Sequence, residues 1–334
     1  MNKKIINAVD DVIPQMTEGF IAANSRHYEK VPGVNGVAYK KRRTGKTALV
    51  VGGGSGHEPM FAGFVGKGLA DAAACGNIFA SPDPGTVAET AKFVQNGKGV
   101  LFVYGNYAGD NLNFDMAEEI LQEEGIETAH VRVRDDCASA PPERTEDRRG
   151  IAGDVFVIKT AGAACDKGLS LAEVKRIAEK TCLNLRSIGV GLSPGQIPGA
   201  EKPTFTLGDN EMEYGLGLHG EPGVKRTVMR PADELAFVMV SAITEDMPLY
   251  SGDEVCVLIN GLGCTTIMEM SIVYRKVAQL LGEKGVAIHD ADINSYCTCM
   301  EMGGFSISIL KLDSELKLYY DTACFSPYYA KEGR

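Results

Sequence analysis

The sequence lacks the features that would place it in a membrane. No apolar run approaches the roughly 20 residues that a membrane-spanning helix needs. The N-terminal stretch MNKKIINAVDDVIPQ turns acidic where a signal peptide would need its apolar region. A net charge of −10 and a pI near 5.1 argue against nucleic acid or an anionic membrane surface as a partner. We therefore expect a cytoplasmic protein that contacts neither.

A metal-binding pattern is also missing. The nine cysteines do not form the two close pairs that typically mark a structural zinc site. Cys297 and Cys299 make a single C-x-C pair without a second one. We expect reduced thiols and no metal site in this chain.

No nucleotide-binding fingerprint is present. Gly45-Lys46-Thr47 matches the end of a Walker A loop, but Lys40 stands where the first glycine belongs and the triplet precedes its predicted strand. The G-x-G-x-x-G pattern fails as well, because counted from Gly52 its last glycine falls on His57. The sequence thus predicts no cofactor bound by this chain itself.

Short β-rich runs alternate with longer helical segments, which predicts an α/β architecture. A chain of 334 residues is too long for one ordinary domain. We expect two α/β domains, 1–185 and 186–334, each with a central mixed β-sheet flanked by helices. The expected strands are 48–51, 100–104, 128–133, 255–259, 286–288 and 305–310, and the expected helices are 114–124, 171–186, 232–247 and a long one that ends near 281.

Three glycine-containing loops each follow a predicted strand: 52–57, 105–110 and 260–263. In open α/β sheets, ligands bind outside the carboxyl ends of the strands, so these loops are candidate walls of a site. Glycine allows the backbone to approach a ligand closely. The loops therefore point to a small-molecule site.

Only five histidines are present, and two of them, His57 and His219, stand among glycines. Histidine can act as a base or a nucleophile near neutral pH. Asp110, in a glycine-bracketed loop after a strand, is a candidate general base. Each also has a structural interpretation: His57 as a loop or capping residue, Asp110 as the cap of the next helix, and His219 as the partner of a backbone carbonyl. The Arg148-Arg149 pair is expected to be solvated or salt-bridged surface.

Seven segments, in order along nearly the whole chain, together resemble the substrate-binding K subunit or K domain of the dihydroxyacetone kinase family. They are GGGSGHEP (52–59), CGNIFASPDP (75–84), NYAGDNLNFDMA (106–117), RRGIAGD (148–154), GLGLHGEPG (215–223), NGLG (260–263) and EMGGFSISILKLD (301–313).

The resemblance implies a kinase subunit that acts on a short ketose in glycerol metabolism. It assigns to His219 the attack on the ketone carbon, which holds the substrate as a covalent hemiaminal. Asp110 would accept the proton of the hydroxyl that is phosphorylated, and His57 would hydrogen-bond near that hydroxyl. The backbone of Gly54, Ser55 and Gly56 would lie against the substrate. The first domain would carry these glycine-rich loops and the second the ketone-binding histidine.

The resemblance also implies partners. In the family, a helical L domain or subunit carries the nucleotide and Mg²⁺, and here we expect it as a separate chain. In many bacteria the L subunit is recharged by the phosphoenolpyruvate-dependent phosphotransferase system through a third, M subunit, and in others ATP is the direct donor. The family further implies a homodimer.

One position departs from the family pattern KNYxGD, because Gly105 stands where the family has a lysine. Lys159 or an arginine could take the place of that lysine. The departure leaves three readings open: dihydroxyacetone as substrate, another short ketose such as erythrulose, or a non-catalytic dihydroxyacetone sensor that acts as a transcriptional coactivator.

Overall fold

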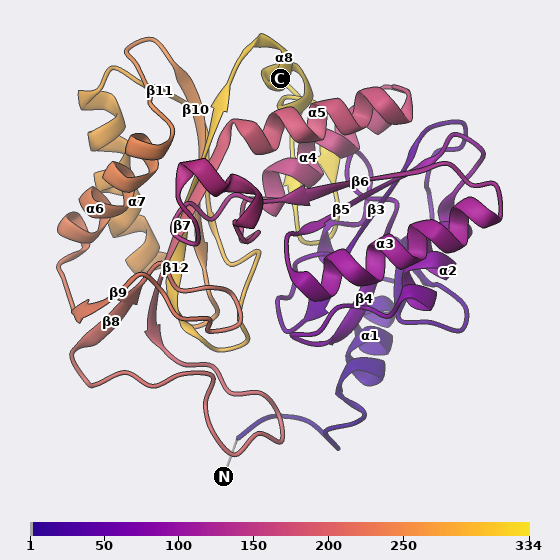
Figure 1. Ribbon diagram of the computed structural model, residues 1–334, viewed down its shortest axis with the longest axis horizontal. Coiled ribbons are helices and arrows are strands. Elements are labelled where there is room, and N and C mark those ends of the chain that lie inside the picture. The colour runs from indigo at the N-terminus through magenta and orange to yellow at the C-terminus, as the bar shows by residue number, and fades with distance from the viewer. Residues whose placement is uncertain (1–2) are drawn as a thin grey trace. The chain divides into compact units, whose positions relative to one another are not determined.

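The computed structural model describes residues 3–334, which form two compact units (Figure 1). The first unit contains residues 3–133 together with Asp154–Thr181 and Glu315–Arg334. The second contains Arg134–Gly153 and Cys182–Ser314. The sequence prediction placed a single boundary between residues 185 and 186. In the structure, residues 134–153 belong to the second unit and residues 315–334 to the first. The amino-acid composition does not reveal which unit each of these two segments joins, because both have the composition of ordinary helices and loops.

The first unit is built on a six-stranded mixed sheet with the order β1-β2-β4-β3-β5-β6. Neighbours from β4 to β6 run parallel, while β1 and β2 are antiparallel to their neighbours. The strands are β1 (Tyr28–Lys30), β2 (Gly36–Tyr39), β3 (Ala48–Ser55), β4 (Ala72–Ile78), β5 (Val100–Gly105) and β6 (Thr128–Val133).

Helices cover this sheet and bury its apolar residues. Alternate residues of the central strands, such as Val50 and Phe102, pack with Val87 and Phe114 of two helices in one core. Since side chains alternate across a strand, the other face of β3 and β5 receives α4, which is buried along nearly its whole length. The helices are α1 (Val12–Ala23), η1 (Ala62–Phe64), α2 (Pro84–Val94), α3 (Ala108–Glu123), α4 (Asp154–Asp166), α5 (Leu171–Leu183) and α8 (Ser314–Tyr320).

The C-terminal segment returns to the first unit and is anchored there. The ammonium group of Lys159, on α4, is fully buried and donates hydrogen bonds to the carbonyl oxygens of Tyr319 (3.0 Å) and Thr322 (2.6 Å). The small sheet of β13 (Cys324–Phe325) and β14 (Ala330–Lys331) follows. A buried charge is tolerated only when it is hydrogen-bonded, so Lys159 ties the segment to the unit's interior.

The second unit has a six-stranded mixed sheet with the order β11-β10-β12-β7-β8-β9. Only β10 and β11 are parallel; the other neighbours are antiparallel. Its elements are η2 (Pro142–Asp147), β7 (Leu185–Ser193), β8 (Glu211–Tyr214), β9 (Lys225–Val228), α6 (Ala232–Asp246), β10 (Glu254–Gly261), α7 (Ile267–Glu283), β11 (Ala287–Asn294) and β12 (Gly303–Leu312).

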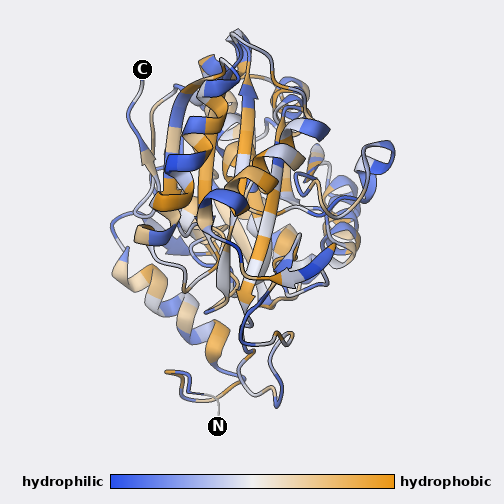
Figure 2. Ribbon diagram, turned by 90° about the vertical axis from the view of Figure 1, so that its left-hand side faces the viewer, coloured by the Kyte–Doolittle hydropathy of each residue, from blue (hydrophilic) through white to orange (hydrophobic). Residues whose placement is uncertain are grey.

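Apolar residues of this sheet and of α6 and α7 form one core. Figure 2 is viewed from the side on which these two helices lie. Mostly apolar strands lie behind helices in which apolar and polar residues alternate. Thr266 and Glu269 form a capping box at the start of α7, which explains where that helix begins.

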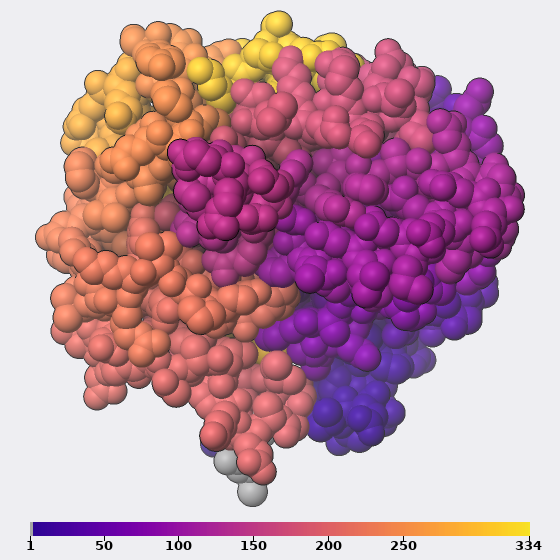
Figure 3. Space-filling view, in the orientation of Figure 1, coloured from indigo at the N-terminus to yellow at the C-terminus, as the bar shows by residue number. Residues whose placement is uncertain are grey.

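The segment 134–153 belongs to the second unit because its charged residues pair there. The carboxylate of Asp135 accepts hydrogen bonds from the backbone N–H groups of Ile151 and Gly153, both at 2.8 Å. The guanidinium of Arg148 is fully buried against Asp246 of α6. In the space-filling view the segment is a magenta patch bordered by the orange atoms of this unit (Figure 3). The expectation that Arg148 lies at the surface is therefore wrong, since its salt bridge is buried.

The predicted fold class, two α/β halves with mixed sheets flanked by helices, is confirmed. None of the helices between residues 3 and 334 is both long enough and apolar enough to cross a bilayer. The nine cysteines carry free thiols, and Cys264 is the one that is exposed.

Candidate active site

The glycines at 52–54 lie within β3 rather than in a loop after it, which corrects the sequence prediction. They are required by packing against their neighbours. A Cβ atom at Gly53 would lie 2.4 Å from the ring of Phe61, and one at Gly54 would lie 2.8 Å from the backbone nitrogen of Ala80. The absence of side chains thus lets β3 continue its parallel pairing with β4.

The chain leaves β3 at Ser55 and places His57 in a buried turn. The Ser55 hydroxyl donates to the carbonyl oxygen of Gly76 at 2.7 Å. Gly56 has a φ of +99°, a conformation that favours glycine. Its N–H donates to the Glu58 carboxylate, at 3.1 and 3.0 Å from the two oxygens. Burial raises the pKa of Glu58, while hydrogen bonds from backbone N–H groups oppose the rise.

The ring of His57 is buried and stacks on Phe79, with 5.0 Å between the ring centroids. Phe79 has a φ of +54°, which is uncommon for a residue with a side chain. Its N–H donates to the Ser55 carbonyl at 2.9 Å, so the strained turn is held against the end of β3. The stack fixes the plane of the His57 ring. In the sequence, Phe79 stands out only as part of the motif CGNIFASPDP.

Asp110 lies in the first turn of α3, which begins at Ala108 with Tyr107 at the N-cap position. Asp110 is therefore not the helix cap, and the helix starts six residues before its predicted start. Its side chain is buried at 8% exposure. The positive end of the helix dipole favours a carboxylate at this position, which suits an anionic base.

His57 and Asp110 share one edge of the first unit's sheet. β3 and β5 are neighbouring parallel strands, paired from Ala48 with Val100 to Val51 with Val103. His57 follows the carboxyl end of β3, and Asp110 follows that of β5. This is the edge at which open α/β sheets bind ligands.

His219 lies in the second unit, in the loop that joins β8 and β9. The two strands pair antiparallel, with Tyr214 opposite Lys225, so the loop closes on itself. Leu216 and Leu218 are buried and anchor it, while the side chain of His219 is 24% exposed. The histidine is thus presented at the surface of a fixed loop.

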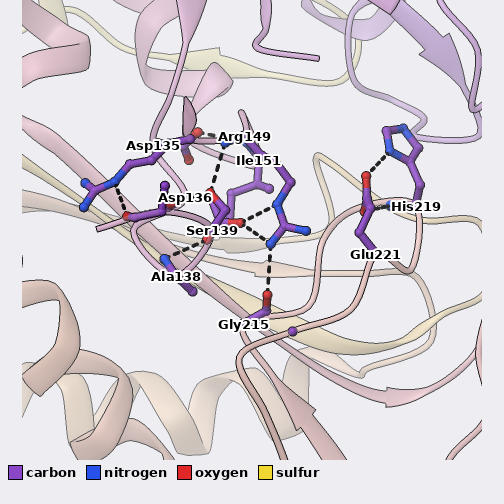
Figure 4. A network of polar contacts seen from close by, with 12 residues as sticks. Asp135, Asp136, Ala138, Ser139, Arg149, Ile151, Gly215, His219 and Glu221 are labelled. Carbon is purple, nitrogen blue, oxygen red and sulfur yellow. Dashed lines mark hydrogen bonds and ion pairs between the residues drawn. The ribbon is translucent and has the colours of Figure 1, made fainter. Parts of the chain in front are cut away.

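Glu221 orients the His219 ring (Figure 4). One carboxylate oxygen accepts the backbone N–H of His219 at 2.9 Å, and the other lies 2.7 Å from the ring Nδ1. Burial raises the pKa of Glu221, but the hydrogen bonds and the charge of His219 outweigh it and hold this pKa at about 2. An ionised carboxylate accepts only, so Nδ1 carries the proton and Nε2 the lone pair when the ring is neutral. Glu221 has no assigned role in the sequence-based prediction.

Arg149 holds the start of the same loop through its contact with Gly215 (Figure 4). Its guanidinium pairs with Asp136 at 2.8 Å and donates to the carbonyl oxygen of Gly215 at 3.0 Å. A Cβ atom at Gly217 would lie 2.5 Å from Nη1 of Arg149. Burial raises the pKa of Asp136 to about 6, although the Arg149 charge opposes this. Arg149 is thus salt-bridged, as expected, and it supports the histidine loop.

Two other candidate positions have structural roles. The side chain of Asn260 is fully buried and forms hydrogen bonds with the backbone of Tyr296 and Cys297. It therefore stabilises the loop after β11. Lys159, considered as a replacement for the family's lysine, anchors the C-terminal segment. At Gly105, where the family has a lysine, a Cβ atom would lie 3.3 Å from the Tyr107 ring and 3.6 Å from Oδ2 of Asp154.

One cluster with metal-ligand side chains occurs among residues 3–334. Asp115, Glu118 and His130 place their ligand atoms within 4.8 Å of one another. Arg132 binds both oxygens of Asp115, at 2.6 and 2.7 Å, and Nδ1 of His130 lies 2.6 Å from Glu118. The negative charge of Asp115 is therefore already balanced by a cation from the protein, and the cluster forms an ion-pair network at the surface.

The sequence matches the Dak1 domain family over residues 18–328. A Listeria innocua protein named PTS-dependent dihydroxyacetone kinase 2, dihydroxyacetone-binding subunit DhaK, is 44% identical over 98% of this chain and 99% of its own length. A Pectobacterium atrosepticum protein named L-erythrulose kinase is 41% identical over 98% of this chain, which spans 56% of that larger protein.

Two solved structures share the fold at a TM-score of 0.90. The dihydroxyacetone kinase of C. freundii is 29% identical, and the similarity covers 99% of this chain and 61% of that one. The dihydroxyacetone kinase operon co-activator Dha-DhaQ is 25% identical and covers 98% of this chain and all of its own. A kinase and a regulator thus have the same fold, so the residues of the site must separate the two functions.

Proposed function

The chain belongs to the Dak1 domain family, and from that premise we propose that it is the ketone-binding subunit of a dihydroxyacetone kinase. The observation that carries the proposal is the His219–Glu221 pair at 2.7 Å, which prepares a histidine to act as a nucleophile. The similarity to a DhaK subunit over 99% of that subunit's length agrees with it.

The proposed reaction begins at the ring of His219. Its Nε2 lone pair attacks the ketone carbon, a C–N bond forms, and the electrons of the C=O π bond move to the oxygen, which takes up a proton from solvent water. The ring becomes positively charged, and the Glu221 carboxylate at Nδ1 offsets that charge. The product is a hemiaminal that fixes the hydroxyl to be phosphorylated.

Asp110 is the proposed general base for that hydroxyl, and His57 the proposed hydrogen-bond partner. Both follow the carboxyl ends of neighbouring strands, and the buried His57 ring is held by Phe79. The backbone of Gly54, Ser55 and Gly56 remains the proposed contact surface for the substrate, in addition to the packing role of Gly54. A positioned base contributes typically about 10²–10⁴-fold to the rate of such a step.

The phosphoryl donor is proposed to reach the substrate from another chain. Phosphoryl transfer needs a bound donor with metal ions, and we assign both the nucleotide and Mg²⁺ to a separate L subunit. An M subunit of the phosphotransferase system as the source of the phosphate, a homodimer and a cytoplasmic location remain proposals. The name of the Listeria relative, which is PTS-dependent, favours the phosphoenolpyruvate route over ATP.

Two alternatives have support of their own. The similarity to an erythrulose kinase favours a longer ketose, and the departure at Gly105 agrees with it. The similarity to Dha-DhaQ favours a sensor that captures dihydroxyacetone without turning it over. Asp110 and His57 favour the kinase, because a sensor has no need for a base.

A phosphorylation assay separates the three. The protein is combined with a cognate L subunit, a panel of short ketoses, and either ATP or the phosphotransferase components. We expect turnover of dihydroxyacetone with the phosphotransferase components. Preferred turnover of erythrulose would support the second reading, and adduct formation with no turnover of any ketose would support the sensor. A Gly105→Lys variant tested in parallel shows whether this position sets the preference among ketoses.

A further inference from the structure

The first unit contains a cavity of about 410 Å³ that the proposed reaction does not use. We call it the cationic pocket. It is lined by the segment after β2, the turn before β4, the end of α4 and part of the C-terminal segment. Its basic residues are Lys41, Arg42, Arg43, Lys46, Lys67 and Lys167.

These six cations face only two carboxylates in the lining, those of Asp71 and Asp166, although the whole chain carries a net charge of −10. Solvated charges of both signs normally intermingle on a protein surface. A concentration of one sign, opposite to the charge of the whole protein, attracts counter-charged ligands to that place.

The two carboxylates are already satisfied. Nζ of Lys46 lies 2.9 Å from Asp71 and 2.8 Å from Asp166. The second oxygen of Asp166 accepts the Gly68 N–H at 2.8 Å, and that of Asp71 accepts the Leu49 N–H at 2.9 Å. The floor of the pocket is therefore a closed network, which leaves the remaining cations to face the cavity.

Lys41, Lys67 and Lys167 are exposed, and within the described part of the chain their ammonium groups form no ion pair. Arg43 uses one nitrogen for the backbone carbonyl of Asp166 at 2.8 Å and keeps further donors. Arg42 differs, since it pairs with Glu29 outside the pocket. Three ammonium groups and one guanidinium thus surround a cavity without an anionic partner.

We propose that the cationic pocket binds a small phosphate monoester. Such a ligand carries close to two negative charges and three acceptor oxygens, which ammonium and guanidinium groups bind with charge-assisted hydrogen bonds. The volume lies within the roughly 300–1,000 Å³ of small-molecule sites. The pocket belongs to one unit and contains none of the residues proposed for ketone capture, so this binding is a function beyond the proposed reaction.

Calorimetric titration of the full-length protein with glycerol 3-phosphate, inorganic phosphate and glycerol tests the proposal. Glycerol 3-phosphate has no carbonyl and cannot form an adduct with His219. We expect both phosphates to bind, more weakly as NaCl rises, and glycerol not to bind. Absence of binding by both phosphates at 10 mM (about the weakest affinity worth assigning to a site) overturns the proposal.

Charge-reversal variants locate the site. Lys67→Glu and Lys167→Glu should each weaken glycerol 3-phosphate binding by about tenfold or more, the equivalent of one lost charge-assisted contact. Lys98→Glu makes the same change at an exposed position of the first unit outside the pocket and should leave the affinity within about twofold. Equal losses in all three variants overturn the proposal, because they indicate only long-range charge. All three residues are exposed, and melting curves verify that each variant folds.

Phosphate binding in the cationic pocket can be tested separately from ketone capture by His219. A His219→Ala variant that loses its ketone adduct should bind glycerol 3-phosphate with unchanged affinity. If His219→Ala abolishes phosphate binding as well, the ligand sits at the reaction site and the cationic pocket is not its site.

Discussion

The two regions that carry the proposed chemistry hold their reactive side chains in different ways. His57 and Asp110 are buried at the carboxyl ends of neighbouring parallel strands, where His57 stacks on Phe79 and Asp110 lies in the first turn of α3. His219 is partly exposed in a hairpin loop, and the carboxylate of Glu221 and the guanidinium of Arg149 position it. The first region therefore depends on packing, which includes the stack of His57 on Phe79 and the contact of Gly53 with Phe61, and the second on charge.

The difference fits the tasks proposed for the two regions. A residue that captures a ketone must be reachable and then hold one ring nitrogen in a defined state, which a neighbouring charge achieves. A general base and its partner must keep their geometry through the transfer step, which rigid elements achieve. Substitutions that change packing should therefore damage the first region most, and those that change charge the second.

The largest effect is expected from His219→Ala. The covalent mass increment found after trapping the ketone should disappear, and phosphorylation should fall by about 10³-fold or more, because the nucleophile is lost. Mass spectrometry of the trapped protein measures the adduct. His289→Ala, at a half-buried histidine of the same unit, serves as the control and should keep the adduct. An adduct that survives in His219→Ala removes this residue from its proposed role.

Asp110→Asn should separate the two regions. Capture of the ketone should persist at the wild-type level, while kcat should fall by about 10²–10⁴-fold, since the amide cannot accept the proton. The control is Asp115→Asn on the same helix, where the carboxylate is half-exposed and pairs with Arg132. Wild-type turnover in Asp110→Asn would show that another group is the base.

Gly53→Ala tests the dependence of the first region on packing. The new methyl group would lie 2.4 Å from the Phe61 ring, so the free energy of unfolding should fall by about 1–3 kcal/mol. Gly19→Ala is the matched control, because that helical position has no atom within 4 Å and should gain up to about 1 kcal/mol. Denaturant titration measures both. Equal stability of the two variants would show that β3 accommodates a methyl group at position 53 without strain.

Glu221→Gln tests the dependence of the second region on charge. The rate of adduct formation should fall about tenfold through loss of the electrostatic contact with the ring, and Tm near neutral pH should fall as well, because the ionised carboxylate stabilises the folded state. Glu221→Asp, which keeps the charge, should recover part of the rate. A rate in Glu221→Gln equal to that of the wild type contradicts the positioning role.

The same pair predicts a dependence of stability on pH. The folded-state pKa of Glu221 is lowered from 4.5 to about 2, so its contribution is present above pH 4.5 and is lost as the pH falls toward 2. The difference in unfolding free energy between the wild type and Glu221→Gln should shrink across this interval. A difference that stays constant from pH 5 to pH 2 would contradict the assigned cause.

Much of the fold was predictable because it follows local patterns. The strand 128–133 has its predicted bounds, and the helix expected at 232–247 is α6, Ala232–Asp246. The glycines of β3 misled the prediction, since glycine is typical of loops and only the ring of Phe61 explains Gly53 in a strand. The segment 134–153 was unpredictable for a similar reason: the partner of Arg148 is Asp246, about a hundred positions away in sequence.

The candidate site was found through its residue types and its motif resemblance, and the supporting residues were not. His57, Asp110 and His219 stand out by chemistry and glycine context. Phe79 and Glu221 do not, because aromatic and acidic residues are common and only geometry shows that each holds a histidine ring. Their role depends on contacts that a linear pattern does not contain.

Because residues 315–334 belong to the first unit, the two units can complete their folding only in a certain order during synthesis. The ribosome releases the chain from its N-terminus, so every residue of the second unit emerges before the carbonyl groups that Lys159 needs. At about 5–20 residues per second, many seconds pass before the carbonyl groups of Tyr319 and Thr322 become available to Lys159. The part of the protein that is begun first is therefore completed last, and the second unit, an insertion within it, is free to fold in the interval.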